Sequence, residues 1–404
     1  MVHKCSVRGE QPREDHVEPH LGWFHRYPAR FHHEVLSQMF DGVERRLGCK
    51  PKTILDPFVG TGSTLSFAKQ HRISSVGVEL TPLAVLISKV RLNPLEDVDI
   101  AVELAERIAS LETQRQTHSF PDELVFWIGK KNALALASYL ARIARLQDAK
   151  LKRWLFLAVS SALRPSSRWL VGSIKPQVDP ERKPSTINRH FLRCARMLKR
   201  DCEAEWAEYC DTVETRIYRG NAQSLPLSNA SVEAIITSPP YETMYDYFDV
   251  HRLSYLAFGW NCELQKQIGR SKHIERDGEG FEAPRHMVNW YRDEYRAEAT
   301  LDGRALRAYF VSMRRHLMEA RRVLRQNGVV AYAVANTFRN GRKFALALAL
   351  SDAMRQAGFQ QVELVRRENS HRRILPAGRD RQTGRFSSSA PDAGVEEYLI
   401  FARR

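Results

Sequence analysis

An α/β fold with a parallel, doubly wound sheet is the fold class that the sequence predicts. Apolar runs rich in β-branched residues recur along the chain and are bounded by turn formers, as buried strands are. Segments of helical period lie between several of these runs, and such alternation is typical of a parallel sheet with helices on both faces. The chain of 404 residues also exceeds the usual size of a single domain, so we expect large insertions or a second domain.

Six strands are expected because their runs are short, apolar and followed by turn residues. In chain order they are Thr53–Phe58, Ser74–Leu80, Val232–Thr237, Val329–Ala335, Val362–Arg366 and Tyr398–Ala402. Helices are expected at Gly62–His71, after the first strand, and at Arg314–Leu324, before the fourth.

One long stretch interrupts the alternation of strands and helices. From Asp97 to Tyr209 the pattern is almost wholly helical, with runs at Val102–Leu111, Ala133–Leu146 and Asn188–Leu198. Within it, residues 163–185 are rich in Pro, Ser and basic residues, which predicts a basic loop. We therefore expect a discontinuous α/β domain at residues 1–96 and 210–404, an all-helical insertion at 97–209 and a smaller, loop-rich insertion at 261–303.

The composition favours a polyanionic partner. Lysine and arginine outnumber aspartate and glutamate by 62 to 47, which favours a polyanion over an acidic small molecule alone. Nucleic acid is the first candidate, although a basic surface can also serve solubility alone. The six cysteines show no zinc-ligand spacing, and neither a metal site nor a disulfide scaffold is expected. The N-terminus lacks the apolar core of a secretory signal, and no stretch approaches the roughly 18 apolar residues of a membrane span, so we expect a cytoplasmic protein.

A glycine-rich turn follows the first strand. Its sequence from Asp56 to Thr64 is Asp-Pro-Phe-Val-Gly-Thr-Gly-Ser-Thr, and two glycines at a strand-to-helix turn let backbone N–H groups approach a ligand. Leu65 replaces the third glycine of the dinucleotide fingerprint, and the Gly-Lys-Ser/Thr of a phosphate loop is absent. Asp56 can face an ammonium group, and Glu79, at the end of the next strand, can hold ribose hydroxyls. Together they fit the two ends of S-adenosylmethionine; the alternative is that Asp56 caps the helix and Glu79 is solvated.

A rigid turn follows the third predicted strand. In Ser238-Pro239-Pro240-Tyr241 the prolines fix the φ angles and lack N–H donors, so the turn presents carbonyl oxygens. Ser238 Oγ and the Pro239 carbonyl can accept the hydrogens of an exocyclic amine, and the Tyr241 ring can stack on an extruded base. Positioning then suffices for methyl transfer to nitrogen. Methylation of a ring carbon calls for a thiolate, usually after a proline, and no cysteine here follows one.

These residues resemble those of bacterial amino-methylating DNA methyltransferases, especially the cytosine-N4 enzymes. In that family the loop has the sequence Asp-Pro-Phe-x-Gly-x-Gly-Thr/Ser-Thr, and the cytosine-N4 members typically carry Ser-Pro-Pro-Tyr where adenine-N6 members begin with Asp or Asn. The resemblance covers residues 23–92 and 216–259, and more loosely 320–404. It implies a Rossmann-like S-adenosylmethionine-dependent methyltransferase fold with a large helical insertion, acting on double-stranded DNA by base flipping. A cognate restriction endonuclease is a candidate partner, and the oligomeric state is left open.

The resemblance also assigns site residues. His25–Phe31 is similar to the segment that closes over the methionine end of the cofactor, and Asn221 matches the position that touches the adenine ring, where Asp is commoner. The catalytic residues are Ser238, Pro239, Pro240 and Tyr241. The expected cofactor-binding residues are Tyr27, Pro28, Phe31, Asp56, Phe58, Gly60, Gly62, Ser63, Thr64, Glu79 and Asn221. Tyr247 and Phe248, after the catalytic turn, belong either to the base pocket or to the core.

The helical insertion matches the family nowhere residue by residue, so it is the candidate target-recognition region. The candidates for DNA contact, as against a merely solvated face, are Arg164, Arg168, Lys175, Arg182, Lys183 and Arg252. Three other functions compete with cytosine-N4 methylation: adenine-N6 methylation of DNA, amino-methylation of RNA, and DNA-binding regulation without chemistry. Ser238 disfavours adenine-N6 methylation, and the lack of a recognisable RNA-binding module disfavours RNA as the substrate. The intact glycine-rich loop and Ser-Pro-Pro-Tyr turn disfavour a regulator without chemistry.

Overall fold

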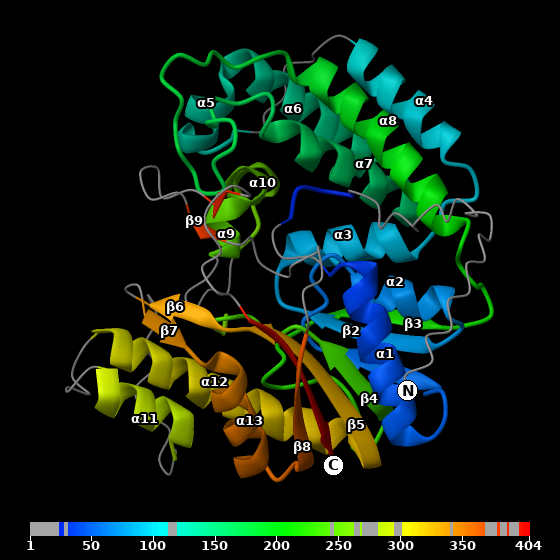
Figure 1. Ribbon diagram of the computed structural model, residues 1–404. Coiled ribbons are helices and arrows are strands. Elements are labelled where there is room, and N and C mark those ends of the chain that lie inside the picture. Colours follow the sequence, from blue (N-terminus) through cyan, green and yellow to red (C-terminus); the bar gives the residue numbers. More distant parts are fainter. Residues whose placement is uncertain are drawn as a thin grey trace, which may run out of the picture.

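A computed structural model describes the chain at residues 24–27, 31–111, 119–242, 246–261, 267–268, 282–294, 301–339, 342–367, 378–379, 386–387 and 396–404. It shows a twisted sheet with helices on both faces, and a lobe of helices stands over the carboxyl ends of the first strands (Figure 1). None of the described helices is long and apolar enough to cross a membrane.

The central sheet has seven strands in the order β3-β2-β1-β4-β5-β11-β8. Their bounds are β1 Thr53–Asp56, β2 Ser74–Glu79, β3 Thr215–Arg219, β4 Val232–Thr237, β5 Leu324–Ala335, β8 Gln360–Arg366 and β11 Glu397–Arg403. β1 to β5 run parallel, whereas β11 is antiparallel to both of its neighbours. The fold is the Rossmann-like α/β fold that the sequence predicts. Two short hairpins pair β6 Thr337–Arg339 with β7 Arg342–Phe344, and β9 Gly378–Arg379 with β10 Phe386–Ser387.

Two features of the sheet differ from the sequence prediction. β3 is absent from the six predicted strands because it is an edge strand whose residues, Thr-Arg-Ile-Tyr-Arg, are exposed or only half-buried, so it lacks the apolar run of a buried strand. The antiparallel direction of β11 is set by its connection and its pairing with β5, to which its apolar pattern gives no clue.

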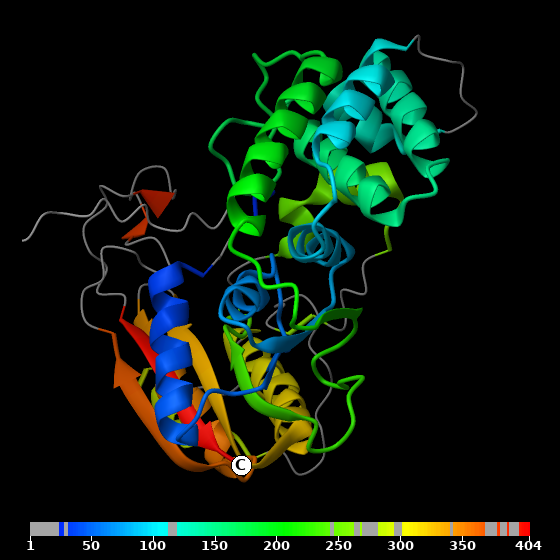
Figure 2. The ribbon, with the colours of Figure 1, turned by 90° about the vertical axis from the view of Figure 1, so that its right-hand side faces the viewer.

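Alternation along the strands divides the core between the two faces of the sheet. Ile54 in β1 and Ala331 in β5 belong to the cluster with α1 (His33–Leu47) and α2 (Ser63–Gln70). Their neighbours Leu55 and Tyr332 point the other way, into the cluster with α12 (Leu301–Val323) and α13 (Leu346–Gln356). Figure 2 shows α1 and α12 on opposite sides of the sheet. The doubly wound packing thus follows directly from the strand period.

A helical lobe separates β2 from β3. α3 (Pro82–Leu92) leads into α4 Asp99–Ser110, α5 Asp122–Ile128, α6 Lys130–Ala144, α7 Ala149–Leu163 and α8 Ile187–Trp206. Its core is continuous with the rest of the chain, because Phe24, Leu83 and Leu253 share one buried cluster with Trp154 and Phe191 of the lobe. After the Ser238–Tyr241 turn, α9 (Tyr247–Val250) and α10 (Arg252–Phe258) pack beneath this lobe (Figure 1).

The segment at 261–303 is partly helical. α11 spans Arg285–Glu294, and α12 begins at Leu301, so these parts differ from the loop-rich insertion expected there. Met287 of α11 is buried, and α11 packs against α13, because its apolar residues recur at helical spacing. Much of the remaining segment lies outside the described residues.

A buried ion pair ties the lobe to the first turn of the sheet domain. Arg91 in α3 and Glu205 in α8 are each about 1% exposed, and their atoms Nε and Oε1 lie 2.5 Å apart. Arg91 Nη1 also donates to the carbonyl of Thr61 and to Ser63 Oγ, both at 3.1 Å. The guanidinium therefore connects the last helix of the lobe to the glycine-rich turn.

Candidate active site

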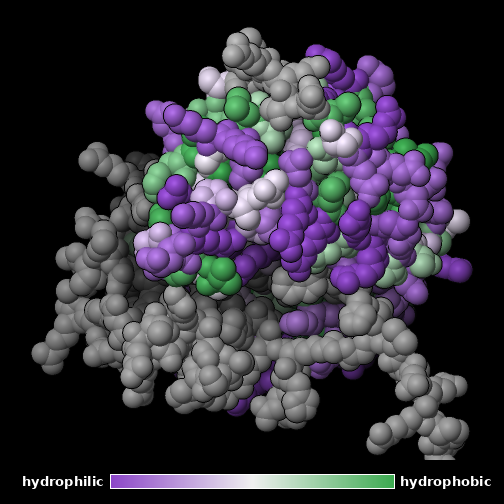
Figure 3. Space-filling model, turned by 90° about the horizontal axis from the view of Figure 1, so that it is seen from above, coloured by the Kyte–Doolittle hydropathy of each residue, from purple (hydrophilic) through white to green (hydrophobic). Residues whose placement is uncertain are grey.

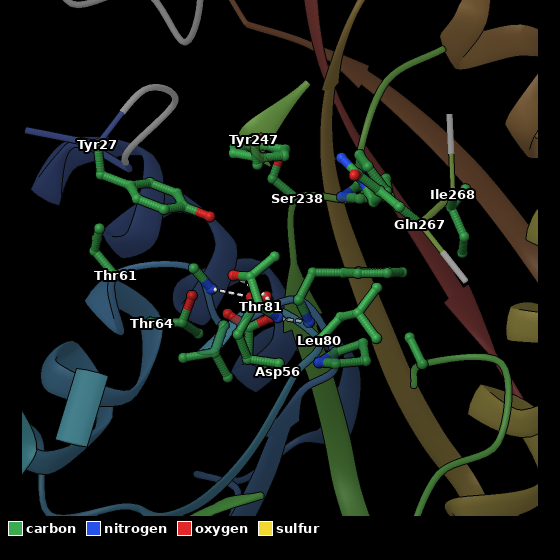
Figure 4. Close-up of a pocket in the computed structure, with 18 of the residues that line it drawn as sticks. Tyr27, Asp56, Thr61, Thr64, Leu80, Thr81, Ser238, Tyr247, Gln267 and Ile268 are labelled. Atoms are coloured by element: carbon green, nitrogen blue, oxygen red, sulfur yellow. Dashed lines mark hydrogen bonds between the residues drawn. The ribbon is translucent and has the colours of Figure 1, made fainter. Parts of the chain in front are cut away.

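A pocket opens at the carboxyl ends of β1, β2 and β4, where α/β sheets bind ligands. The glycine-rich turn after β1, Glu79 at the end of β2 and the turn after β4 line it together (Figure 4). Motifs about 180 residues apart in sequence thus meet in one cavity, since Thr237 Oγ1 donates to Asp56 Oδ1 at 2.6 Å, across 181 residues. Among the described residues, no cluster of His, Cys, Asp or Glu is arranged to hold a metal ion.

The two glycines of the first turn adopt left-handed backbone conformations. φ is +53° at Gly60 and +84° at Gly62, a region that side chains with a Cβ rarely occupy. A Cβ on Gly62 would also lie 3.2 Å from Cβ of Ser88 in α3. Gly62 is the N-cap of α2, and Ser63 and Thr64 in the first turn of this helix line the pocket.

Two buried carboxylates occupy the floor of the pocket. Asp56, which is 1% exposed, accepts hydrogen bonds from Thr237 and from the N–H of Phe58 at 3.0 Å, and burial raises its pKa to about 6. Glu79 accepts hydrogen bonds from the N–H of Gly60 at 2.9 Å and of Thr81 at 2.7 Å. Burial also raises the pKa of Glu79. Glu79 is therefore not a solvated side chain, and Asp56 bonds to Phe58 of its own turn and to Thr237 of β4 instead of capping α2, whose N-cap is Gly62.

Aromatic rings form one side of the pocket. Tyr27, from the segment before α1, stacks on Tyr247 of α9 with 5.4 Å between ring centroids and an interplanar angle of 17°. It also stacks on His251, at 4.9 Å and 15°. Figure 4 shows Tyr27 and Tyr247 at the rim, opposite Asp56. Burial raises the pKa of Tyr27 well above its ordinary value, so the phenol stays protonated.

The Ser238–Tyr241 turn is anchored by its last residue. Tyr241 is 9% exposed, and its hydroxyl accepts a hydrogen bond from the N–H of Ala335, at the end of β5, at 2.9 Å. Burial is the largest cause that raises the pKa of Tyr241, so its phenol stays protonated. Half-buried Ser238 and Pro240 lie at the pocket surface. The turn is thus held against the neighbouring strand while it lines the cavity.

Nearly all of the predicted cofactor and catalytic residues line this pocket. Phe31, Phe58, Ser63, Thr64 and Asn221 are among them, and the amide oxygen of Asn221 accepts the N–H of Gln223 at 2.9 Å. Gly62 stands behind the turn as the N-cap of α2, and Pro28 lies outside the described residues.

Sequence reasoning missed several residues of the pocket, among them Thr81, Gln267 and Ile268. Thr81 could have been found from its place two residues beyond Glu79, at a strand end; Gln267 and Ile268 carry no comparable signal.

Sequence reasoning also missed His316 in α12, which is fully buried and bonds to the carbonyl of Ala222 at 3.0 Å and to the hydroxyl of Tyr332 at 2.6 Å. Burial lowers the pKa of His316 to about 4, so it is a neutral support beneath the Asn221 strand end.

The basic candidates for DNA contact fall into three groups. Lys175 and Lys183 are exposed. The guanidinium groups of Arg164 and Arg168 lie over the rings of Trp169 and Phe126, at 4.3 Å and 5.6 Å from the centroids.

The other two arginines already have partners within the protein. Arg182 donates to the carbonyls of Trp169 at 2.6 Å and Pro165 at 2.5 Å. Arg252 pairs with Glu123 of α5, and Asp249 lies 3.3 Å away. A phosphate contact by Arg252 stays a prediction, and this ion pair would compete with it.

Comparison with known proteins shows similarity to methyltransferases. The sequence is 26% identical over 272 residues to the Type II methyltransferase M.BsoBI of Geobacillus stearothermophilus, across 58% of this chain and 52% of that protein. The chain is thus similar in sequence to a Type II methyltransferase. A second such methyltransferase, M.MvaI of Kocuria varians, is 21% identical over 354 residues, which cover 78% of this chain and 76% of that protein. The chain therefore spans about half of M.BsoBI and about three quarters of M.MvaI.

No protein-family model matches the sequence. Among solved structures, the rRNA methyltransferase aviRa from Streptomyces viridochromogenes superposes with a TM-score of 0.35 and 12% identity, covering 97% of this chain and 94% of that one. At that score the likeness to a methyltransferase of RNA supports no conclusion about the substrate.

Proposed function

We propose that the protein is an S-adenosylmethionine-dependent DNA methyltransferase that modifies the N4 amine of cytosine. One observation carries the proposal: the Ser238–Tyr241 turn and the two buried carboxylates, Asp56 and Glu79, line a single pocket. An acceptor-rich turn and a cofactor site must share a cavity if a methyl group is to pass directly to an amine. The relationship to Type II methyltransferases supports the same chemistry.

The residues of the pocket fit S-adenosylmethionine. Asp56 lies at the amino end of the turn and offers a carboxylate to an ammonium group, and Glu79 lies at the end of the neighbouring strand, where it can accept ribose hydroxyls. Tyr27 and Phe58 supply apolar surface between them. When bound, the cofactor supplies an electrophilic methyl group. Around it the buried side chains exclude water, which strengthens the electrostatic interactions of the site.

The catalytic turn would orient the target amine. Because the Tyr241 hydroxyl is fixed to β5 and two prolines stiffen the turn, Ser238 keeps a set position at the pocket surface. Ser238 Oγ and the carbonyl oxygen of Pro239 then accept hydrogen bonds from the two N–H groups of the amine. The lone pair of the amine nitrogen is thereby directed at the methyl group. No covalent intermediate with the enzyme is needed. Ser238 in place of Asp or Asn favours cytosine over adenine as the target.

Target recognition is assigned, in the same proposal, to the helical lobe. Its outer surface is largely hydrophilic, with scattered apolar side chains (Figure 3). The lobe stands over the carboxyl ends of the strands whose turns line the pocket (Figure 1). A duplex whose base enters the pocket would therefore pass beside the lobe. The name of the relatives makes a cognate restriction endonuclease a candidate partner.

Nucleoside analysis by mass spectrometry tests the proposal. Plasmid and bacterial genomic DNA are incubated with the protein and S-adenosylmethionine carrying a labelled methyl group, then digested to nucleosides. We expect label in N4-methylcytosine, and Ser238→Ala should lower the rate at least 100-fold, in line with loss of about 3 kcal/mol of transition-state stabilisation. Cofactor affinity of that variant, measured by calorimetry, should stay within about twofold, because Ser238 contributes to the amine site.

Other outcomes would redirect the assignment. Label in N6-methyladenine would keep the mechanism and overturn the reading of Ser238. Label in total RNA and none in DNA would move the substrate to RNA. If the wild-type protein binds duplex DNA but fails to bind the cofactor, the regulator without chemistry is the correct function.

A further inference from the structure

A second pocket lies beside the first, beneath the helical lobe. His25 and Arg26 of the N-terminal segment, Arg164 at the end of α7, Arg182 in the following loop and His251 before α10 all line it. Tyr27 lines the first pocket and His251 the second, and their rings are stacked 4.9 Å apart. A single pair of rings therefore separates the two cavities.

The second pocket gathers positive charge. Three guanidinium groups, from Arg26, Arg164 and Arg182, line it, and no described lining residue is Asp or Glu. Arg182 donates to two backbone carbonyls, which hold its side chain without neutralising its charge. Within the part of the chain that the structure describes, none of the three forms a salt bridge, whereas Arg252 nearby is paired with Glu123.

Two nitrogen atoms in this pocket are buried without a hydrogen-bond partner among the described residues: Nη2 of Arg164 and Nε2 of His251. His251 is 6% exposed, and its ring lies between Tyr27 and His25. Leaving such buried polar atoms unpaired costs about 1–3 kcal/mol each, and more for a charged group such as the Arg164 guanidinium. Burial and the charges of Arg26 and Arg182 lower the pKa of Arg164 to about 9, so its cation is destabilised in the pocket as described.

An anion would resolve these features together. It would accept a hydrogen bond from Nη2 of Arg164 and offset the positive charges of the three arginines. It would also give Nε2 of His251 a hydrogen-bond partner. The guanidinium of Arg164 is preoriented, since it lies over the Trp169 ring, and planar guanidinium groups match the oxygens of a phosphate. With a formal net charge of +15, the molecule as a whole attracts polyanions.

We propose that the second pocket binds a backbone phosphate of the DNA strand whose target base enters the first pocket. This inference rests on the proposed function and adds to it a specific phosphate site made of Arg26, Arg164 and His251. Phosphate contacts fix the register of a protein on DNA without reading sequence. Here the contact would hold the strand next to the first pocket, on the other side of the stacked rings of Tyr27 and His251.

Fluorescence polarisation with a labelled mixed-sequence DNA duplex of about 30 base pairs, in the presence of S-adenosylmethionine, tests the site. Arg164→Gln should raise Kd about tenfold or more, as expected for loss of a charge-assisted hydrogen bond. It should also make the slope of log K against log salt less steep by about 0.9. Arg164→Lys should recover part of the affinity. Arg45→Gln, which removes an exposed charge from α1 on the sheet domain, is the matched control and should change neither quantity.

Arg26→Gln guards against a trivial folding defect, because Arg26 is exposed and its loss should leave the melting temperature unchanged while weakening DNA binding in the same direction. If the wild-type protein methylates DNA but Arg164→Gln and Arg45→Gln bind the duplex equally well, the phosphate site is wrong and the proposed function stands. The inference is also overturned if only binding of an RNA of the same length responds to Arg164→Gln. Wild-type protein that binds no duplex would remove the proposed function and this site with it.

Discussion

At the scale of single residues, the role proposed for Asp56 in binding the cofactor conflicts with the stability of the unliganded protein. The Asp56 carboxyl is buried against Thr237, and its pKa of about 6 lies above the ordinary value of 3.8. The folded protein thus binds a proton between about pH 4 and pH 6 that the unfolded chain has released. Above pH 6 the ionised group therefore lowers stability, by up to about 3 kcal/mol for a shift of this size.

Asp56→Asn should therefore stabilise the unliganded protein. An amide oxygen still accepts the hydrogen bonds of Thr237 and Phe58, so the free energy of unfolding in urea should rise at pH 8, and the gain should fade as the pH is lowered from 6 to 4. Affinity for S-adenosylmethionine should fall at least tenfold, because the ammonium group loses its partner. Asp41→Asn, at an exposed position of α1, should change neither value. A variant less stable than wild type at pH 8 would contradict the account.

At the scale of elements, the link between lobe and sheet domain is the pair of Arg91 and Glu205. It joins α3 to α8 and reaches the turn through Thr61 and Ser63. Tyr209, just after α8, donates to Glu205 Oε1 at 3.0 Å and so extends the network. Removing one partner of such a pair leaves the other charge buried without compensation.

Glu205→Gln should lower the free energy of unfolding by about 3–5 kcal/mol. Cofactor affinity should fall as well, since Arg91 would no longer hold the turn. Glu203→Gln on the same helix removes a largely exposed partner of Lys199, 3.4 Å away, and should cost less than about 1 kcal/mol. Urea unfolding and calorimetry measure both effects. Equal losses from the two variants would show that the Arg91 network is not what couples the lobe to the turn.

At the scale of the whole molecule, the lobe and the sheet domain share one core. Phe24 and Leu83 lie outside the lobe, yet they pack in the same cluster as Trp154 and Phe191 within it. Two bodies that share buried surface lose it together when either unfolds. We therefore expect the helical insertion and the discontinuous α/β domain predicted from the sequence to unfold together.

Thermal unfolding should show one transition. Four of the seven tryptophans, Trp127, Trp154, Trp169 and Trp206, belong to the lobe, so tryptophan fluorescence reports mainly on it, while far-ultraviolet circular dichroism reports on the whole chain. The two midpoints should coincide and rise together when S-adenosylmethionine is added, as linkage requires. Separate midpoints, with only the dichroism signal moved by the cofactor, would show that the lobe is an independent domain.

What the sequence by itself determined about this protein is local. The strands β1, β2, β4 and β11, the glycine-rich turn from Asp56 to Thr64 and the Ser238–Tyr241 turn follow from apolar period, backbone freedom and the missing N–H groups of proline, which act between near neighbours. Since the carboxyl ends of adjacent parallel strands lie at the same edge of a sheet, the sequence also predicts that the two turns line one pocket.

Only the tertiary structure decided the rest, because it depends on contacts between distant residues. Arg91 and Glu205 are 114 residues apart, and neither shows in sequence that it is buried. The pairing of the polar edge strand β3, the antiparallel course of β11 and the stacking of Tyr27 on His251 likewise arise from packing partners that no local pattern identifies. The basic pocket around Arg164 exists because three segments converge there, and convergence in space is the property that a linear pattern does not encode.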